Sequence, residues 1–205
     1  MTSRERVLTA SAVLSLAVLA GCDSGEAGQA LPTSGAEVST TQSESAGERE
    51  FTKAPPVQDP LDASKYLKDP CSSLTESQQQ EFNVTSSREN SDDDNSGCRW
   101  NVGDGSTSPG VSYATGIEEG LDRLYALNDT GHWDKGYFEP TEVSGYPAVY
   151  VEIVDNRDRG DCNLAVSISD DLFFNSNVLT RAGNDACGAA ENVAKAVIET
   201  IKAGE

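Results

Sequence analysis

The chain has 205 residues, of which 34 are Asp or Glu and 15 are Lys or Arg, and its formal net charge is −19. This length suits one ordinary folded domain. Because such an acidic chain repels phosphate groups, its charge argues against nucleic acid as a partner and against a polybasic membrane-binding surface.

Residues 1–21 follow the plan of a secretory signal peptide. Arg4 and Arg6 precede an apolar run at 7–19, which is shorter than the about 20 residues that a transmembrane helix needs. The run ends in Leu-Ala-Gly-Cys, which resembles the lipobox of bacterial lipoproteins. We therefore predict cleavage before Cys22 and lipidation of Cys22. An uncleaved anchor and an ordinary cleaved signal are the alternatives.

Residues 22–60 differ sharply in composition from the rest of the chain. Ser, Thr, Gly, Glu, Gln and Pro dominate, while apolar residues such as Leu31 and Val38 are isolated. Such a segment buries too little apolar surface to offset the entropy lost on ordering. We predict a disordered acidic tether over 22–60, followed by a single domain at 61–205.

The predicted domain starts with a short helix and a polar loop. Thr75 followed by Gln78 forms a capping box, which predicts a helix over 76–82. Residues 85–97 read as a solvated loop. Their consecutive acids at 92–94 do not match a calcium site, because calcium loops alternate ligands with spacers.

The periodicity of apolar residues predicts the rest of the domain. Alternating or β-branched stretches between turn residues are typical of strands, and they occur at 98–102, 111–115, 137–143, 148–154, 162–168 and 172–179. Helical spacing predicts a helix over 117–127 and a longer one over 185–202, capped by Asp185. The expected fold class is α+β: an antiparallel sheet of about five or six strands, packed by the C-terminal helix and two shorter helices.

The cysteines indicate an oxidising compartment. With Cys22 assigned to lipid, an even set remains, namely Cys71, Cys98, Cys162 and Cys187. The sequence has no Cys-x-x-Cys spacing and one histidine, a pattern unlike that of a zinc site. Of the possible pairings we favour Cys71–Cys98 and Cys162–Cys187, each of which closes a short loop.

Several short motifs resemble a known family. They are Asp69-Pro70-Cys71, Cys98-Arg99-Trp100, Gly145-Tyr146-Pro147-Ala148-Val149, Cys162, and Cys187 on a final alanine-rich helix. Together they resemble an actinobacterial lipoprotein family, the domain-of-unknown-function family three-five-five-eight, from Leu61 to Lys202. The resemblance implies an envelope lipoprotein with a compact α+β domain and no established activity.

No motif in the sequence indicates catalysis. His132 is the only imidazole and lies in no nucleophile motif, and neither Gly-x-Ser-x-Gly nor a glycine-rich phosphate loop occurs. We predict no catalytic residue, no metal ligand and no cofactor. Aromatic residues that are candidates to line a binding groove, but are expected in the core, are Tyr113, Tyr125, Trp133, Tyr137, Phe138 and Tyr146.

The function expected is a non-catalytic binding or sensing domain of a cell-envelope lipoprotein. Lipid on Cys22 would hold it at the cell membrane, outside the cytoplasm, as a monomer. Its partner would be an envelope ligand or protein of unknown identity, and not nucleic acid. The alternatives are a structural or regulatory protein that acts by protein contact and an uncharacterised hydrolase.

Overall fold

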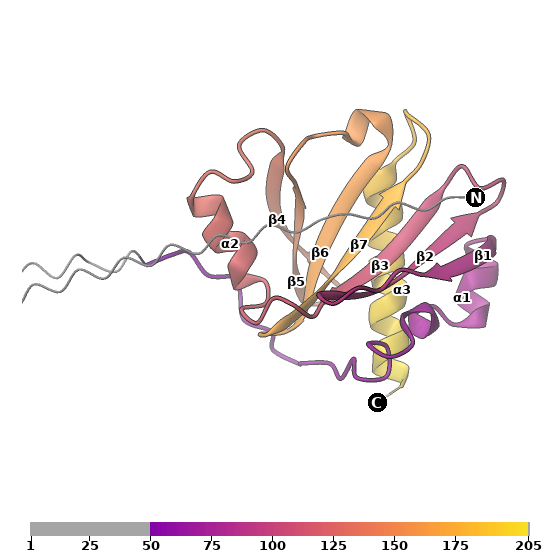
Figure 1. Ribbon diagram of the computed structural model, residues 1–205, viewed down its shortest axis with the longest axis horizontal. Coiled ribbons are helices and arrows are strands. Elements are labelled where there is room, and N and C mark those ends of the chain that lie inside the picture. Colours follow the sequence, from indigo (N-terminus) through magenta and orange to yellow (C-terminus); the bar gives the residue numbers. More distant parts are fainter. Residues whose placement is uncertain (1–49, 205) are drawn as a thin grey trace, which may run out of the picture. The chain divides into compact units, whose positions relative to one another are not determined.

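A seven-stranded antiparallel sheet forms the centre of the computed structural model, which describes residues 50–204 (Figure 1). Its strands are β1 (Val84–Glu89), β2 (Asn95–Val102), β3 (Ser108–Ala114), β4 (Tyr137–Val143), β5 (Tyr146–Glu152), β6 (Asp161–Ser169) and β7 (Leu172–Leu179). The order in the sheet is β1-β2-β3-β7-β6-β5-β4. Two meanders, β1 to β3 and β4 to β7, therefore meet where β3 pairs with β7.

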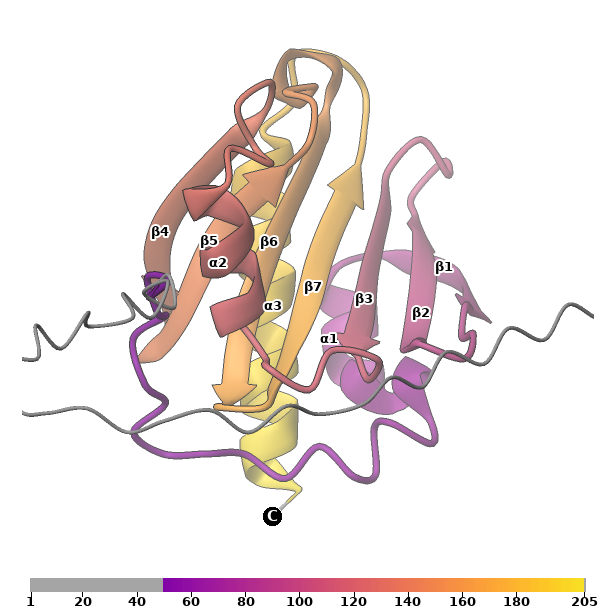
Figure 2. The same cartoon turned by 60° about the vertical axis from the view of Figure 1, so that its left-hand side comes forward.

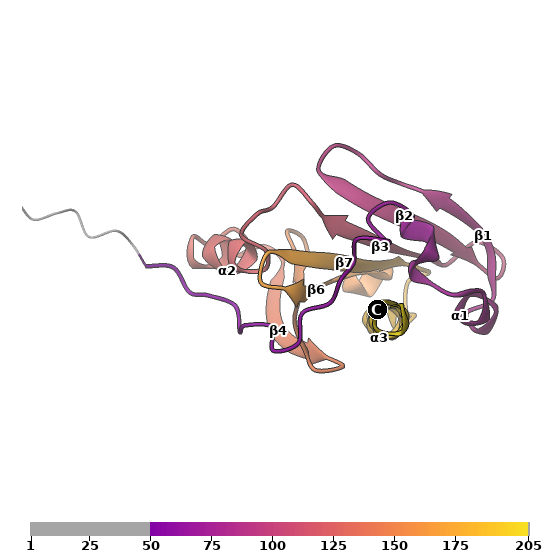
Figure 3. The same cartoon turned by 90° about the horizontal axis from the view of Figure 1, so that it is seen from below.

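Helix α3 (Ala186–Ala203) covers one face of the sheet, and Figure 3 shows it end on against that face. Asp185 caps it by accepting a hydrogen bond from the Gly188 N–H at 2.8 Å. The predicted apolar stripe is buried against the sheet; it comprises Ala190, Val193, Ala194, Val197, Ile198 and Ile201. The predicted helix and its cap are confirmed.

The residues before β1 complete this covered face. A 3-10 helix at Pro70–Ser73 leads into α1 (Glu76–Glu81), whose predicted capping box is present between Thr75 and Gln78. Leu61, Ala63, Tyr66 and Leu74 are buried in the same core as α3. This face therefore has an apolar cover that extends across the sheet from β4 to β2.

The opposite face is covered only in part, by α2 (Asp122–Asp129). Leu121, Leu124 and Tyr125 pack there against residues of β5, β6 and β7. A helix was predicted from residue 117, but α2 begins later because Gly120 adopts a φ of +55°. A Cβ at that position would lie 2.3 Å from the Asp170 carbonyl oxygen, so the chain turns there before the helix starts.

The sheet has seven strands where about five or six were expected, and β1 is the strand that is absent from the six predicted ranges. The sequence predicted a loop over 85–97, but residues 84–89 pair with β2. Val84 is half-buried and the other residues of β1 are exposed, so the strand has no buried side to give an apolar alternation. The loop is confined to a turn, where the Asp92 carboxylate accepts hydrogen bonds from the Asp94 N–H and the Asn95 amide.

Packed structure also begins earlier than Leu61. Backbone N–H groups of Thr52, Ala54 and Val57 donate to carboxylate oxygens at 2.6, 2.8 and 3.0 Å; the acceptors are Asp129, Asp122 and Asp170. Val57 is 8% exposed. Carboxylates of the domain therefore hold residues 52–57, although the composition of this segment predicted that it belongs to the tether. Residues 1–49, which include the predicted signal peptide, Cys22 and most of the predicted tether, lie outside the described residues.

The two predicted disulfides are those of the structure. Cys71–Cys98 joins the 3-10 helix to β2, with the Cα atoms 4.9 Å apart. Cys162–Cys187 joins β6 to the first turn of α3, with the Cα atoms 5.1 Å apart. Each half of the sheet is thereby linked to an element on the covered face.

Candidate functional site

The half of the sheet that α2 leaves uncovered carries polar side chains. Figure 2 shows α2 in front of β5 and β6, α3 behind the sheet, and no described helix in front of β2 and β3. Cys98, Trp100 and Val111 point into the core on the α3 side of the sheet, so the residues that alternate with them point the other way. We call this surface the open face; it comprises Arg88, Arg99, Asn101, Ser112, Asn175 and Asn177.

Arg99 reaches from β2 to β3 and β7 across the open face. Its Nη1 donates to the Ser108 carbonyl at 3.1 Å, and its Nη2 donates to Asn177 Oδ1 at 3.3 Å. Gly110 stands between Arg99 and Asn177 in the register, and a Cβ there would lie 2.7 Å from Asn177 Oδ1. The glycine therefore leaves the space that the side chain of Arg99 needs. The guanidinium keeps further N–H donors for a ligand.

Arg88 is directly opposite Arg99 in the β1–β2 register. Neither guanidinium forms an ion pair with a carboxylate within residues 50–204. Like charges directly opposite one another destabilise a sheet. Two uncompensated cations side by side are unexpected in a chain whose net charge is −19.

The asparagines extend the open face toward α2. Asn163 Nδ2 donates to Asn175 Oδ1 and to the Val151 carbonyl, both at 3.2 Å. The Nδ2 atoms of Asn175 and Asn177 and the Ser112 hydroxyl have no partner among the described residues, and all three side chains are half-buried. The open face therefore offers mainly N–H and O–H donors, which suit a ligand rich in acceptor oxygens.

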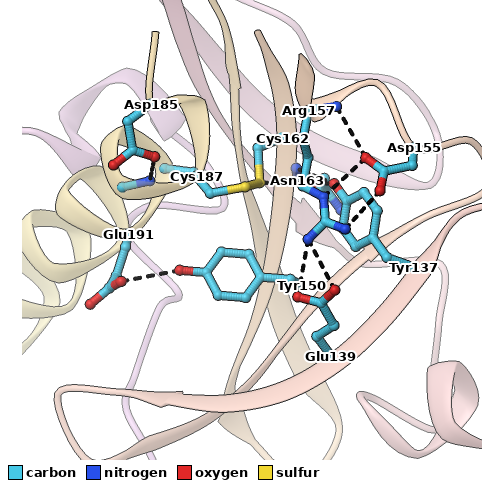
Figure 4. Close-up of a disulfide and its surroundings, with 12 residues drawn as sticks. Tyr137, Glu139, Tyr150, Asp155, Arg157, Cys162, Asn163, Asp185, Cys187 and Glu191 are labelled. Carbon is cyan, nitrogen blue, oxygen red and sulfur yellow. Dashed lines mark hydrogen bonds and ion pairs between the residues drawn. A yellow bond between two sulfur atoms is a disulfide. The ribbon is translucent and has the colours of Figure 1, made fainter. Parts of the chain in front are cut away.

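A second polar cluster lies on the covered side of β4 and β5, beside the Cys162–Cys187 disulfide (Figure 4). Arg157 binds Asp155 at 2.7 Å and Glu139 at 3.0 Å, and its guanidinium lies 4.2 Å from the centre of the Tyr137 ring. The hydrogen bonds from Arg157 lower the pKa of Asp155. Because carboxylates already compensate this arginine, the cluster closes the edge of the sheet and offers no free cation.

A hydrogen bond in the same region joins β5 to α3. The Tyr150 hydroxyl donates to Glu191 Oε2 at 3.1 Å, and Glu191 pairs with Lys195 at 2.6 Å. Burial and then the contact with Glu191 raise the pKa of Tyr150 to about 12. The hydrogen bonds from Lys195 and then Tyr150 lower the pKa of Glu191. This arrangement stabilises the packing of the helix.

The domain also has an apolar groove of about 610 Å³ between α2 and residues 50–53. Phe51, which is 41% exposed, lines it together with Ala126 and Leu127. Lys53 and Asp122 form a long ion pair of 3.9 Å at its margin. Its volume lies within the range of small-molecule pockets.

The aromatic residues singled out in the sequence do not line a binding site. Tyr113, Tyr125, Tyr137 and Tyr146 are buried in the core, and Trp133 and Phe138 pack around α2. The expected place in the core is confirmed for the four tyrosines, whereas Trp133 and Phe138 are half-buried at its margin. His132 is exposed and contacts Trp133 edge-on, with the ring centres 4.5 Å apart.

The residues of the open face were not found from the sequence. In Phe173-Phe174-Asn175-Ser176-Asn177-Val178, amides alternate with residues that the structure buries, and this pattern was a usable signal. Arg88 gave no such signal, because β1 itself was not predicted.

The described residues define an α+β domain with two disulfides, one covered sheet face, and an opposite face that α2 covers in part and that is otherwise open and polar. Among them, no group of three or more His, Cys, Asp or Glu side chains is arranged to hold a metal ion, and no helix is long and apolar enough to span a membrane.

The family described as "Protein of unknown function (DUF3558)" matches residues 17–200, and the chain belongs to this family. The searches of curated proteins and of solved structures gave no match.

Proposed function

We propose that the chain is a membrane-anchored cell-envelope lipoprotein whose domain binds a partner through the open face without catalysing a reaction. The uncovered row of guanidinium, amide and hydroxyl donors carries the proposal, because such groups recognise acceptor oxygens. The lipobox-like sequence at 19–22 supports the anchoring, and the two disulfides agree with an exported domain.

Binding fits the open face better than catalysis does. Its side chains are arginines, asparagines and a serine, and the polar bonds made by Arg99 are to a carbonyl and an amide oxygen. An activated serine needs an adjacent base that a third group orients. The Ser112 hydroxyl has no hydrogen-bond partner among the described residues, so it lacks that arrangement.

The anchoring is tested by fractionation of cells that express the full chain. We expect the wild type in the membrane fraction and the Cys22→Ala variant released in soluble, folded form. A Cys22→Ala variant that stays membrane-bound would show that lipid is not the anchor.

The binding surface is tested by photo-crosslinking in the same cells. A photoreactive amino acid replaces Asn175 on the open face or, as the matched control, Glu199 on the exposed side of α3. We expect a discrete crosslinked product from position 175 and none from position 199. Equal products from both positions, or a product from position 199 alone, would contradict the proposal.

A small apolar ligand in the groove at α2 is the second candidate, favoured by the exposure of Phe51. Native mass spectrometry of the protein from its own membranes would reveal such a ligand as an added mass. Loss of that mass in Phe51→Ser would assign it to the groove.

A further inference from the structure

We propose that β1 is the acceptor edge for an extended segment of a partner protein, which adds to the sheet beside β1 and places a carboxylate opposite Arg88. This inference rests on the proposed function, since it specifies the chemistry of the partner at the margin of the open face. Main-chain hydrogen bonds would supply affinity, and the carboxylate would supply specificity.

Within residues 50–204, no strand pairs with the outer side of the β1 backbone. β1 is the terminal strand of the sheet, and its residues from Thr85 to Glu89 are exposed. The Asn90 N–H donates to the Gly97 carbonyl at 2.8 Å, which fixes the phase of the ladder. Because antiparallel pairs alternate, Arg88 and Ser86 bond toward β2, whereas the N–H and C=O groups of Ser87 and Glu89 point away from it.

The other edge of the sheet is protected against such an addition. β4 contains Pro140, which lacks an N–H donor, and Glu139, which is tied to Arg157 at 3.0 Å. Proline and charged residues are the usual means of blocking an edge strand. β1 contains no proline. β1 does carry the charged residues Arg88 and Glu89 and a bulge between Val84 and Ser86, but it keeps every backbone N–H. An extended segment therefore meets a missing donor at β4 that it does not meet at β1.

The two arginines beside the exposed edge of β1 favour an acidic residue in an added strand. In an added strand, the residue opposite Arg88 would have its side chain on the open face. It would lie beside Arg88, with only β1 between it and Arg99 on β2. Glu89 does not fill this role, because adjacent residues of a strand face opposite sides and its carboxylate accepts a hydrogen bond from the Ser91 hydroxyl at 3.1 Å. A carboxylate from the partner would relieve the repulsion between the two arginines.

A second copy of the chain does not meet this requirement. If two β1 strands paired antiparallel through the outward groups of Ser87 and Glu89, the residue opposite Arg88 would be Val84, Ser86, Arg88 or Asn90, depending on register. None of these has a carboxylate. The charge pattern therefore favours a different protein with an acidic, extended segment.

The test uses the detergent-solubilised full chain and a fluorescent peptide, Thr-Val-Thr-Glu-Thr-Val-Thr, blocked at both ends. A peptide with Lys in place of Glu is its matched control. We expect saturable binding by fluorescence anisotropy that is about fivefold weaker for the Lys peptide, the scale of one exposed ion pair. Binding should also slow hydrogen exchange at the amides of Ser87 and Glu89.

Substitutions in β1 separate strand addition from general adhesion. Ser87→Pro removes an outward N–H but no β1–β2 bond, so we expect it to fold and to lose peptide binding. Ser87→Ala keeps the N–H and should bind as the wild type does. Arg88→Glu should reverse the preference and favour the Lys peptide.

Three outcomes would overturn the inference: no saturable binding of the Glu peptide, binding that Ser87→Pro leaves intact, or a dimer of the chain that Ser87→Pro dissociates. The last would make a second copy the occupant of the edge. Crosslinking from position 175 together with failure of the peptide test would leave the proposed function standing without strand addition at β1.

Discussion

The two halves of the sheet are stabilised in different ways. The half from β4 to β7 lies between α2 and α3, so apolar residues are buried on both of its faces. The half from β1 to β3 is packed mainly on the side of α3 and leaves polar side chains on the other. Stability is thus expected to reside chiefly in the first half, and the surface available to a partner in the second.

The largest expected loss of stability comes from a substitution in the core between the two halves. Phe174 on β7 is fully buried and contacts Tyr113 on β3, with the ring centres 5.9 Å apart. Phe174→Ala should lower the free energy of unfolding by about 4 kcal/mol, from lost apolar burial and a residual cavity. Chemical denaturation measures it. Leu179→Ala, at a position 53% exposed in the same strand, is the control and should change stability by less than about 0.5 kcal/mol.

The disulfides allow a direct comparison of the two halves. The cysteines they link are 27 and 25 residues apart, so the chain-entropy model predicts a similar loss of about 3.5 kcal/mol when either bond is removed. The Cys71→Ala/Cys98→Ala and Cys162→Ala/Cys187→Ala variants, compared by denaturation, test this. A much larger loss for the first pair would show that the half with one covered face depends more on its crosslink than loop length predicts.

The half with two covered faces was also the half that the sequence predicted best. Strands β4 and β7 have the predicted bounds. Buried residues alternate in β7 from Phe174 to Val178, whereas β4 is buried at its two ends, Tyr137 and Val143. The predicted disulfide pairing is confirmed, and so is the cap of α3, which depends on a contact between residues three positions apart.

What the sequence did not reveal depends on contacts that leave no apolar pattern or that join residues distant in the chain. β1 is held by backbone pairing to β2, which leaves no apolar pattern in Thr85-Ser86-Ser87-Arg88. The packing of residues 52–57 depends on carboxylates that are 68 to 113 residues away in sequence. The open face combines β1, β2, β3 and β7, and only the β3–β7 pairing brings Arg99 to Asn177. No local periodicity in the sequence indicates that these two residues are in contact.

In the half from β1 to β3, replacing Tyr113 by Phe should cost more stability than replacing the larger Trp100 by Phe. Tyr113 shares a buried hydrogen bond of 2.8 Å with Ser73, whereas Trp100 Nε1 is buried without a partner among the described residues. Tyr113→Phe leaves the Ser73 hydroxyl unpaired and should cost about 2 kcal/mol. Trp100→Phe removes an unsatisfied donor, which offsets part of the lost packing, and should cost about 1 kcal/mol. Denaturation of both variants gives the order, and a larger loss for Trp100→Phe would show that packing volume dominates in this half.

The smallest expected effect concerns the acid sensitivity of the half from β4 to β7. The pKa of Glu191 is lowered in the folded state by the hydrogen bonds from Lys195 and Tyr150. A lowered pKa means that this carboxylate adds stability above its ordinary pKa of 4.5 and that the contribution is lost as the pH falls through the folded value. Glu191→Gln removes the titrating group, so it should flatten the fall of the melting temperature below about pH 4.5.

The effect of Glu191→Gln at neutral pH should be small, below about 1 kcal/mol, because the side chains of Glu191 and Lys195 are 36% and 44% exposed and water screens the pair. Glu199→Gln on the exposed side of the same helix is the matched control and should keep the wild-type acid profile. If the control flattened the profile equally, net charge, and not the contact between β5 and α3, would govern the acid response. A flattened profile in Glu191→Gln alone would assign that response to the half of the sheet with two covered faces, where Tyr150 meets Glu191 at 3.1 Å.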